Sequence, residues 1–256
     1  MTAGKPDTTD GRFGGKVVLV TGGAGAIGRV TARRFAAEGA TVVLAGRDKA
    51  RLREAAEEIG ADWVAADVTD ARDAAAMVDT VTARHGGLHV AFNNAGVFPT
   101  PGPLADMDPD TWSAAVDINL TGVFLSMKYE IAHMRRSGGG VIVNMASNIG
   151  AHMRLPGMAA YAATKAAVST LTRAAARDHA ADNVRINAVS PGAVDTPMSF
   201  RPGETTAERD ARIATAVPAG RVAEPDEIAA AVLWLASAEA PIVLGADLVL
   251  DGAASA

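Results

Sequence analysis

The chain has 256 residues, of which 49% are hydrophobic, 21% charged and 4% aromatic, and its formal net charge is -5. This length and apolar content suffice for one large core, whereas an acidic chain lacks the basic field that nucleic-acid backbones and anionic membranes require. The absence of cysteine excludes disulfides, thiolate catalysis and cysteine-ligated zinc, and it fits a reducing compartment, so we expect a cytoplasmic protein.

The N-terminal stretch MTAGKPDTTDGRFGGK has no apolar run, so it predicts neither a signal peptide nor a membrane anchor. We expect residues 1–13 to be a flexible tail and residues 14–256 to form one domain. No later stretch reaches the roughly 18 uninterrupted apolar residues that a membrane-spanning helix needs.

From Lys16 onward, short β-branched runs alternate with longer alanine-rich, amphipathic segments. Strands are predicted at KVVLVTG, TVVLAG, DWVAAD, LHVAFNNAG, GGVIVNMAS, NVRINAVSPG and ADLVLDG. Helices are predicted near residues 27–38, 49–59, 71–85, 109–135 and 160–180. Because parallel strands need crossovers and both faces of such a sheet must be covered, this rhythm predicts a doubly wound, Rossmann-like α/β domain of about seven strands.

Residues 195–220 interrupt this rhythm with a polar, proline-punctuated stretch of poor periodicity. Sheet resumes after it, so we interpret it as a mobile lid over a site, carrying one short helix, and not as a linker. Its charged segment ERDARIA, residues 208–214, is interpreted as a solvated helix.

A glycine-rich turn, VTGGAGAIGR, follows the first strand directly and opens the first helix. Gly23, Gly25 and Gly28 can be aligned as G-x-G-x-x-G, in which glycines let backbone N–H groups approach a pyrophosphate at a positive helix end. A glycine turn of this kind also occurs in α/β proteins that bind no dinucleotide, so the motif needs support from other segments.

That support comes from motifs in the same order as in the classical type of short-chain dehydrogenase/reductase, which the chain resembles from residue 15 to 252. The turn is similar to the family's T-G-x-x-x-G-x-G, with Ala26 at the place of the middle glycine. The further matching segments are ADVT (66–69), NNAG (93–96), DINLTGVF (117–124), IVNMAS (142–147), YAATK (161–165), SPGAVDTPM (190–198) and VLDGAASA (249–256), the last with Ala253 where a second glycine is frequent.

The resemblance implies a nicotinamide dinucleotide as the cofactor. Asp67 would bond the adenine amino group, Val68 would flank the ring, and Val194 and Thr196 would hold the nicotinamide carboxamide. The full set of implied cofactor residues is Gly22, Gly25, Ala26, Ile27, Gly28, Arg47, Asp67, Val68, Asn93, Ala95, Gly96, Tyr161, Lys165, Pro191, Gly192, Val194 and Thr196.

The resemblance also implies the catalytic residues Asn119, Ser147, Tyr161 and Lys165. Ser147 would hold the substrate oxygen, Tyr161 would exchange a proton with it, and Asn119 would hold a relay water. An unperturbed tyrosine titrates near ~10, so we expect the Lys165 ammonium and an oxidised nicotinamide to lower the Tyr161 pKa; a shift of about 3 units corresponds to roughly 4 kcal/mol.

The residue at the end of the second strand decides between NAD and NADP in this kind of fold. The sequence there is LAGRDK, with Gly46 at the usual acidic place and Arg47 after it, which favours NADP over NAD. The alternative is that Arg47 is simply a solvated residue at the start of the next helix.

The substrate is predicted from loops that would lie over the nicotinamide. They carry His152, Met153, Leu155, Met158, Met198 and Phe200, which favour an apolar ketone or secondary alcohol. The predicted function is therefore an NADPH-dependent ketoreductase. NAD-dependent alcohol or diol dehydrogenase, a catalytically silent nucleotide-binding regulator and methyl transfer on a related fold remain alternatives.

Two further expectations concern metals and partners. His85 and His89 are separated by a glycine pair and have no carboxylate cluster beside them, so no metal site is expected. Small outward residues in AAVSTLTRAAARDHA, 166–180, favour helix packing between subunits, and the resemblance implies a homotetramer.

Overall fold

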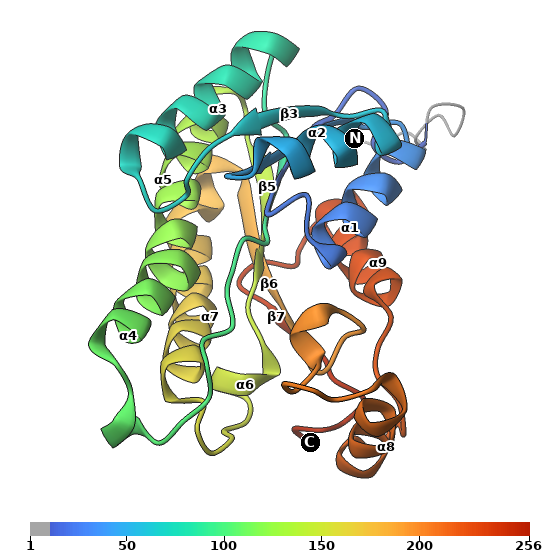
Figure 1. Cartoon of the computed structure of the whole chain (residues 1–256). Helices are drawn as coiled ribbons and strands as arrows, with labels where there is room; N and C mark the ends of the chain where they lie inside the picture. The colour runs from blue at the N-terminus through green and yellow to red at the C-terminus, as the bar shows by residue number, and fades with distance from the viewer. Residues whose placement is uncertain (1–10) are drawn as a thin grey trace.

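The computed structural model describes residues 11–256, which form a seven-stranded parallel sheet covered by helices on both faces (Figure 1). The strand order is β3-β2-β1-β4-β5-β6-β7, which confirms the predicted doubly wound, Rossmann-like domain. The strands are β1 (Val17–Thr21), β2 (Thr41–Gly46), β3 (Asp62–Ala65), β4 (Val90–Asn93), β5 (Gly140–Met145), β6 (Val184–Pro191) and β7 (Asp247–Leu250). The helices are α1 (Ala26–Ala37), α2 (Lys49–Ile59), α3 (Ala71–His85), α4 (Pro109–Val116), α5 (Gly122–Arg136), α6 (Asn148–Ala151), α7 (Ala159–His179), α8 (Thr206–Ala216) and α9 (Pro225–Ala236). Short 3₁₀ turns lie at Leu104–Asp106, Ala180–Asp182 and Pro197–Ser199.

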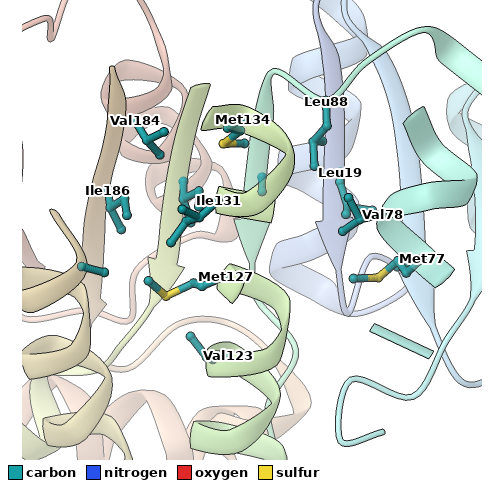
Figure 2. Packing of buried hydrophobic residues seen from close by; sticks show 14 of the residues in the cluster. Leu19, Met77, Val78, Leu88, Val123, Met127, Ile131, Met134, Val184 and Ile186 are labelled. Atoms are coloured by element: carbon teal, nitrogen blue, oxygen red, sulfur yellow. The ribbon is translucent and has the colours of Figure 1, made fainter. Parts of the chain in front are cut away.

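Side chains of the strands alternate between two apolar cores, one on each face of the sheet. Leu19 of β1 lies with Val78 of α3 in the core under α3, α5 and α7 (Figure 2). Its neighbour Val20 belongs to the core under α1, α2 and α9, together with Phe35. The continuous apolar runs of the sequence are therefore strands buried on both faces.

The predicted helix at 109–135 is interrupted in the structure. α4 ends at Val116, residues Asp117–Thr121 form a π-helical turn, and α5 begins at Gly122. Asn119 lies in this turn with its side chain fully buried. Apolar periodicity cannot distinguish such a turn from a continuous helix, and π turns of this kind are frequent at functional sites.

Helix α9 is absent from the sequence prediction, although its start carries recognisable signals. Pro225 occupies its first turn, and Glu224 and Glu227 form a capping box. α9 packs beside α1 on one face of the sheet (Figure 1), where Ile228 and Leu233 are buried.

The predicted tail, residues 1–13, falls mostly on residues 1–10, which lie outside the described residues. Arg12 and Phe13, by contrast, pack on α1: Phe13 is buried at a ring distance of 4.8 Å from Phe35, and Arg12 pairs with Glu38. Within residues 11–256, none of the helices is both long and apolar enough to cross a membrane.

A buried polar network links α5 to the two central strands β4 and β5. Glu130 of α5 is fully buried and accepts a hydrogen bond from Asn93 Nδ2 at 2.9 Å, and Asn93 Nδ2 also donates to Asn144 Oδ1 at 3.1 Å. Among the described residues, Glu130 Oε1 and Asn93 Oδ1 have no hydrogen-bond partner. Burial raises the pKa of Glu130 to about 7, although the bond from Asn93 opposes the shift.

This raised pKa predicts that the protein loses stability as the pH rises. The folded state binds the Glu130 proton more tightly than the unfolded state does, so stability falls between the unfolded pKa of 4.5 and about 7. Glu130→Gln should remove this slope and stabilise the protein above neutral pH by on the order of 3 kcal/mol. Urea unfolding between about pH 5 and pH 8 checks this, with the exposed Glu57→Gln as control. An unchanged slope in Glu130→Gln would show that another group is responsible.

Candidate active site

The carboxyl ends of the central strands meet at one edge of the sheet, where several of the predicted site residues follow them. The strand register places Thr21 of β1 beside Asn93 of β4. Thr21 Oγ1 accepts hydrogen bonds from the N–H groups of Asn94 at 3.1 Å and Ala95 at 3.2 Å. Thr21 thus joins the glycine-rich turn to the NNAG segment, a role that our sequence analysis did not assign to it.

The glycine-rich turn depends on two glycines for its shape. Gly22 has a positive φ of 62°, and a Cβ on Gly28 would lie 2.4 Å from Gly22 O. Ala26, at the place of the family's middle glycine, is exposed, so its methyl group does not crowd the turn. α1 starts at Ala26 with no side-chain cap and no acidic residue in its first turn. Its N-terminus is therefore suited to the pyrophosphate of a dinucleotide.

The adenosine end of the predicted site lies at the ends of β2 and β3. Arg47 is exposed, with a guanidinium nitrogen 3.8 Å from Asp67 Oδ2. Val68 is buried against the start of α5, where a Cβ on Gly122 would lie 2.7 Å from Val68 Cγ2. Asp48, the neighbouring acidic residue, accepts the first N–H groups of α2 as its N-cap. Asp48 is thus engaged by the start of α2, while the exposed guanidinium of Arg47 lies just after the carboxyl end of β2.

Tyr161 and Lys165 lie one turn apart near the start of α7, and both side chains are buried. Lys165 Nζ is 5.8 Å from the centre of the Tyr161 ring and donates a hydrogen bond to Met145 O at 2.8 Å. β5 therefore fixes the ammonium group from one side while the tyrosine ring lies on the other.

Burial shifts both pKa values away from the ionised forms. It lowers the pKa of Lys165 to about 8 and raises the pKa of Tyr161, and hydrogen bonding with Ser147 only partly offsets the rise at Tyr161. The sequence analysis expected a lowered Tyr161 pKa with an oxidised nicotinamide beside it; in the protein alone, desolvation of the phenol outweighs the hydrogen bond with Ser147 and the pKa lies above its usual value. Lys165 by itself does not make the phenol acidic.

The loop after β5 brings Ser147 to the Tyr161 side of α7. Ser147 is 6% exposed, and its Oγ accepts a hydrogen bond from Ile149 N at 3.2 Å. Gly150, at a φ of 142°, passes so close to α7 that a Cβ there would lie 2.8 Å from Ala166 N. Only glycine permits this approach, which fixes the serine loop against the helix that carries Tyr161 and Lys165.

The side chain of Asn119 forms two hydrogen bonds with the backbone of Val97, the residue that follows the NNAG segment. Its Oδ1 accepts from Val97 N at 2.8 Å, and its Nδ2 donates to Val97 O at 2.9 Å. A Cβ on Gly96 would lie 3.2 Å from Asn119 Oδ1 and 3.6 Å from Lys165 Nζ, so these three residues are adjacent. The side-chain amide of Asn119 thus holds the NNAG loop in place beside the lysine.

Phe98 is a neighbour of the predicted catalytic group that our sequence analysis did not identify. Its ring packs edge-on against the Tyr161 ring at a centroid distance of 4.8 Å. Phe98 follows the NNAG segment by two residues, and this position is the one sequence signal that could have indicated it.

The predicted nicotinamide loop follows β6. Gly192 N donates to Leu250 O of β7 at 3.0 Å, and Val194 is buried and pairs with Ala223. Thr196 Oγ1 donates to Val194 O at 3.3 Å and thereby holds the loop in a turn. A wide, open depression of about 540 Å³ adjoins this loop, lined by Thr196, Phe200 and Arg201 among others.

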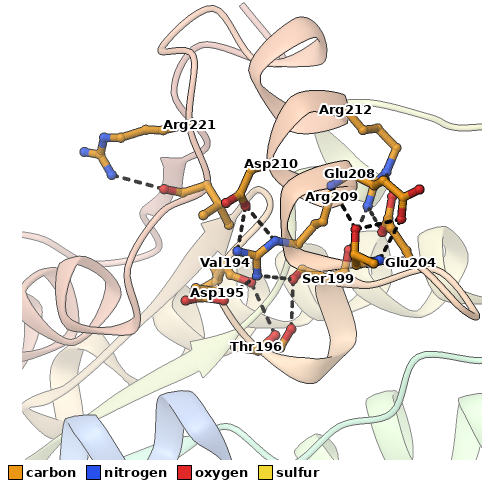
Figure 3. Close-up of polar contacts among 12 residues, drawn as sticks. Val194, Asp195, Thr196, Ser199, Glu204, Glu208, Arg209, Asp210, Arg212 and Arg221 are labelled. Atoms are coloured by element: carbon orange, nitrogen blue, oxygen red, sulfur yellow. Dashed lines mark hydrogen bonds and ion pairs between the residues drawn. The ribbon is translucent and has the colours of Figure 1, made fainter.

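The segment 195–216 is organised by two arginines of α8 (Figure 3). Arg209 is buried, bonds Asp195 and Asp210, and lies 4.5 Å from the centre of the Phe200 ring. Arg212 bonds Glu204 and also Ser199 O. The interpretation of 208–214 as a solvated helix is therefore wrong for Arg209 and Ile213, which are both buried. The charge of Arg209 is paired with Asp195, outside this segment, and with Asp210.

The two histidines considered for a metal have separate partners. His85 Nε2 lies 3.0 Å from Asp62 Oδ2, whereas His89 Nδ1 accepts from Val17 N at 2.9 Å. Gly86, in the left-handed conformation, ends α3 between them.

Comparison with known proteins gives consistent matches. A family model described as enoyl-(acyl carrier protein) reductase matches residues 22–254. The cis-4-hydroxycyclohexanecarboxylate dehydrogenase of Sinomonas cyclohexanicum is 42% identical over 247 residues, covering 94% of this chain and 96% of the relative. The cyclohexanol dehydrogenase of Acinetobacter sp. (strain SE19) is 35% identical over 248 residues, with coverages of 94% and 96%.

Solved structures agree with these matches. A short-chain type dehydrogenase/reductase from Mycobacterium ulcerans has a TM-score of 0.90 and 31% identity, covering 95% of this chain and 90% of that one. The same fold therefore extends over nearly the whole chain. The chain belongs to the short-chain dehydrogenase/reductase family and is an oxidoreductase that acts on CH–OH groups with a nicotinamide cofactor.

Proposed function

We propose that the protein is an NADPH-dependent ketoreductase that acts on an apolar, cyclic ketone and on the corresponding secondary alcohol in reverse. The observation that carries this proposal is the convergence of Ser147, Tyr161 and Lys165 in one buried group beside the NNAG loop. Asn119 completes the group through its bonds to Val97.

The cofactor, when bound, supplies a hydride for the carbonyl carbon. A proton must then reach the carbonyl oxygen, and Tyr161 donates it from its phenol while the Ser147 hydroxyl holds that oxygen by a hydrogen bond. The hydride and the proton together convert the ketone to the secondary alcohol. Lys165 lies near enough to stabilise the phenolate that Tyr161 leaves behind, and the reverse sequence oxidises the alcohol.

Tyr161→Phe tests the acid/base role. Because the phenylalanine ring keeps the packing but has no proton to give, kcat should fall roughly 100- to 10,000-fold, whereas the Kd for NADPH should change less than about twofold. Steady-state kinetics and cofactor fluorescence measure these quantities. Tyr129→Phe, at the second of the two tyrosines, is the matched control and should keep full activity. Near-normal turnover by Tyr161→Phe would remove Tyr161 from the mechanism.

The preference for NADP rests on two arginines near the end of β2. Gly46 offers no carboxylate to the ribose hydroxyls, and Arg47 follows it with an exposed guanidinium. Arg51, one turn into α2, extends to Ala24 O of the glycine-rich turn at 3.5 Å. A ribose phosphate between these groups would meet two positive charges.

The double variant Arg47→Ala, Arg51→Ala should therefore lose NADPH selectively. We expect its kcat/KM for NADPH to fall at least about tenfold while the value for NADH stays within about twofold. Arg53→Ala is the control on the same helix, since Arg53 lies 5.8 Å from the Trp63 ring and away from the turn. A wild-type protein that prefers NADH would overturn the NADP assignment.

The substrate class is supported by the residues near the nicotinamide loop and by the relatives. Leu155 and Met198 are exposed apolar side chains on loops at this end of the sheet, and Met153 and Phe200 lie on the same loops. The two relatives described above are named for six-membered ring alcohols. A panel of cyclic and open-chain ketones with both cofactors would separate this class from others.

An NAD-linked alcohol or diol dehydrogenase is the second candidate. It is favoured by the pairing of Arg47 with Asp67, which neutralises part of the charge that would attract a ribose phosphate, and by the relatives, which are named as dehydrogenases. A silent nucleotide-binding regulator would show cofactor binding without turnover of any ketone or alcohol.

The assembly is proposed to be a cytoplasmic homotetramer. An apolar groove lies between α5 and α7, lined by Phe124, Ile131 and Leu171, and Phe124 is 47% exposed. A second copy of the chain could cover this groove with the same helices. A monomer by light scattering at micromolar concentration would contradict the tetramer.

A further inference from the structure

The loop that follows Ser147 is held together by hydrogen bonds between its own residues. Met153 N donates to Asn148 O at 2.8 Å, and Gly150 N donates to Met153 O at 2.8 Å. Asn148 Nδ2 also contacts Met153 Sδ at 3.0 Å. The segment 148–153 is therefore one compact turn, and it begins directly after Ser147.

A buried carboxylate of β7 holds this turn from the far side. Asp247 has a side chain that is only 1% exposed, and its Oδ2 lies 2.9 Å from His152 Nε2. A carboxylate can only accept, so the histidine nitrogen donates. The other oxygen, Oδ1, accepts from Ser190 Oγ at 2.5 Å. A guanidinium nitrogen of Arg173, on α7, lies 3.7 Å from Oδ2, the oxygen that also contacts His152.

Ser190 precedes Pro191 and Gly192, so one carboxylate contacts both loops of the predicted site. Its first contact is the loop of Ser147, and its second is the strand end that leads into the nicotinamide loop. The two partners lie 95 and 57 residues from Asp247 in the chain.

A second carboxylate repeats this arrangement four residues later. Asp251 accepts from Asn148 Nδ2 at 3.1 Å and from Ser255 Oγ at 2.6 Å. Gly192 passes so close that a Cβ there would lie 2.8 Å from Asp251 Cβ. Burial raises the pKa of Asp251, but the hydrogen bonds from Ser255 and Asn148 outweigh it and leave the pKa lowered, so the group is an anionic acceptor at neutral pH.

We infer that His152 is a positioning residue for the reaction: through its bond to Asp247 it sets the distance between Ser147, which holds the substrate oxygen, and the loop that holds the nicotinamide. This inference rests on the proposed function. Asp247 binds one ring nitrogen of His152. The His152 side chain is 21% exposed, so part of the imidazole remains in contact with solvent. Loss of the bond leaves Asp247 with Ser190 and Arg173 and releases the serine loop at its outer end.

The test compares His152→Leu, which cannot donate, with His152→Gln, whose amide can reach the carboxylate. kcat and KM are measured with cyclohexanone and NADPH, the Kd for NADPH is measured by fluorescence, and hydrogen exchange is followed at the amides of residues 149–153. The matched control is His85→Leu, because His85 has the same 21% side-chain exposure and a 3.0 Å bond to Asp62 at the far end of β3.

We expect His152→Leu to lower kcat/KM for the ketone roughly 10- to 100-fold and to speed exchange of the loop amides, with the NADPH Kd within about twofold. His152→Gln should restore most of the lost kcat/KM and most of the slow exchange of the loop amides. His85→Leu should change neither kcat/KM nor the exchange. If His152→Leu fails to fold, His152→Asn, whose amide is too short to reach Asp247, takes its place. Equal activity of the Leu and Gln variants would overturn the inference.

Failure of the proposed function would look different. In that case the wild-type protein would turn over neither cyclohexanone nor any other ketone, while the exchange experiment would still test the bond. Faster exchange of the loop amides in His152→Leu than in His152→Gln would then support the hydrogen bond between His152 and Asp247 as the contact that holds the loop on β7. Identical exchange in the two variants would contradict it.

Discussion

The burial of Tyr161 beside Lys165 is the constraint on which the rest of the site depends. A buried phenol resists ionisation, and burial also disfavours the charged form of the lysine, so the pair is not reactive simply because it is close. Under the proposed function the neutral phenol donates its proton to a held ketone oxygen, whereas oxidation of the alcohol needs the ionised phenol, which the positive charge of an oxidised nicotinamide would favour. The glycine-rich turn, the predicted nicotinamide loop and the serine loop lie at this same edge of the sheet, where they would position a cofactor and a substrate beside the pair.

Close backbone contacts make this convergence possible. Gly150 lets the serine loop lie against α7, Gly96 lets the NNAG loop pass beside Asn119 and Lys165, and Gly28 closes the turn over the start of α1. Polar side chains also join neighbouring elements by directional hydrogen bonds, which apolar contacts do not provide. Glu130 of α5 bonds Asn93 of β4, and Asp247 of β7 bonds His152 of the serine loop. The site is thus supported from several elements of the fold.

Much of the fold could be predicted from the sequence, because strands buried on both faces appear as continuous β-branched runs and the first turn has its glycines. The π-helical turn at Asn119 could not, since its apolar positions continue the helical pattern on either side. Helix α9 could have been predicted from Pro225 and its capping box. The direction of the Tyr161 pKa and the bond between His152 and Asp247 depend on burial and on contacts between distant residues, which local sequence patterns do not reveal.

The most direct test of this account is the pKa of Tyr161 with and without oxidised cofactor. Tyr129→Phe leaves Tyr161 as the single tyrosine, so NMR of an isotope-labelled tyrosine Cζ reports its titration alone. We predict a pKa above the usual value of about 10 for the protein by itself and a marked fall when NADP⁺ is bound, because its nicotinamide carries the positive charge that Lys165 alone does not provide. A phenol whose pKa is the same in both states would contradict the account.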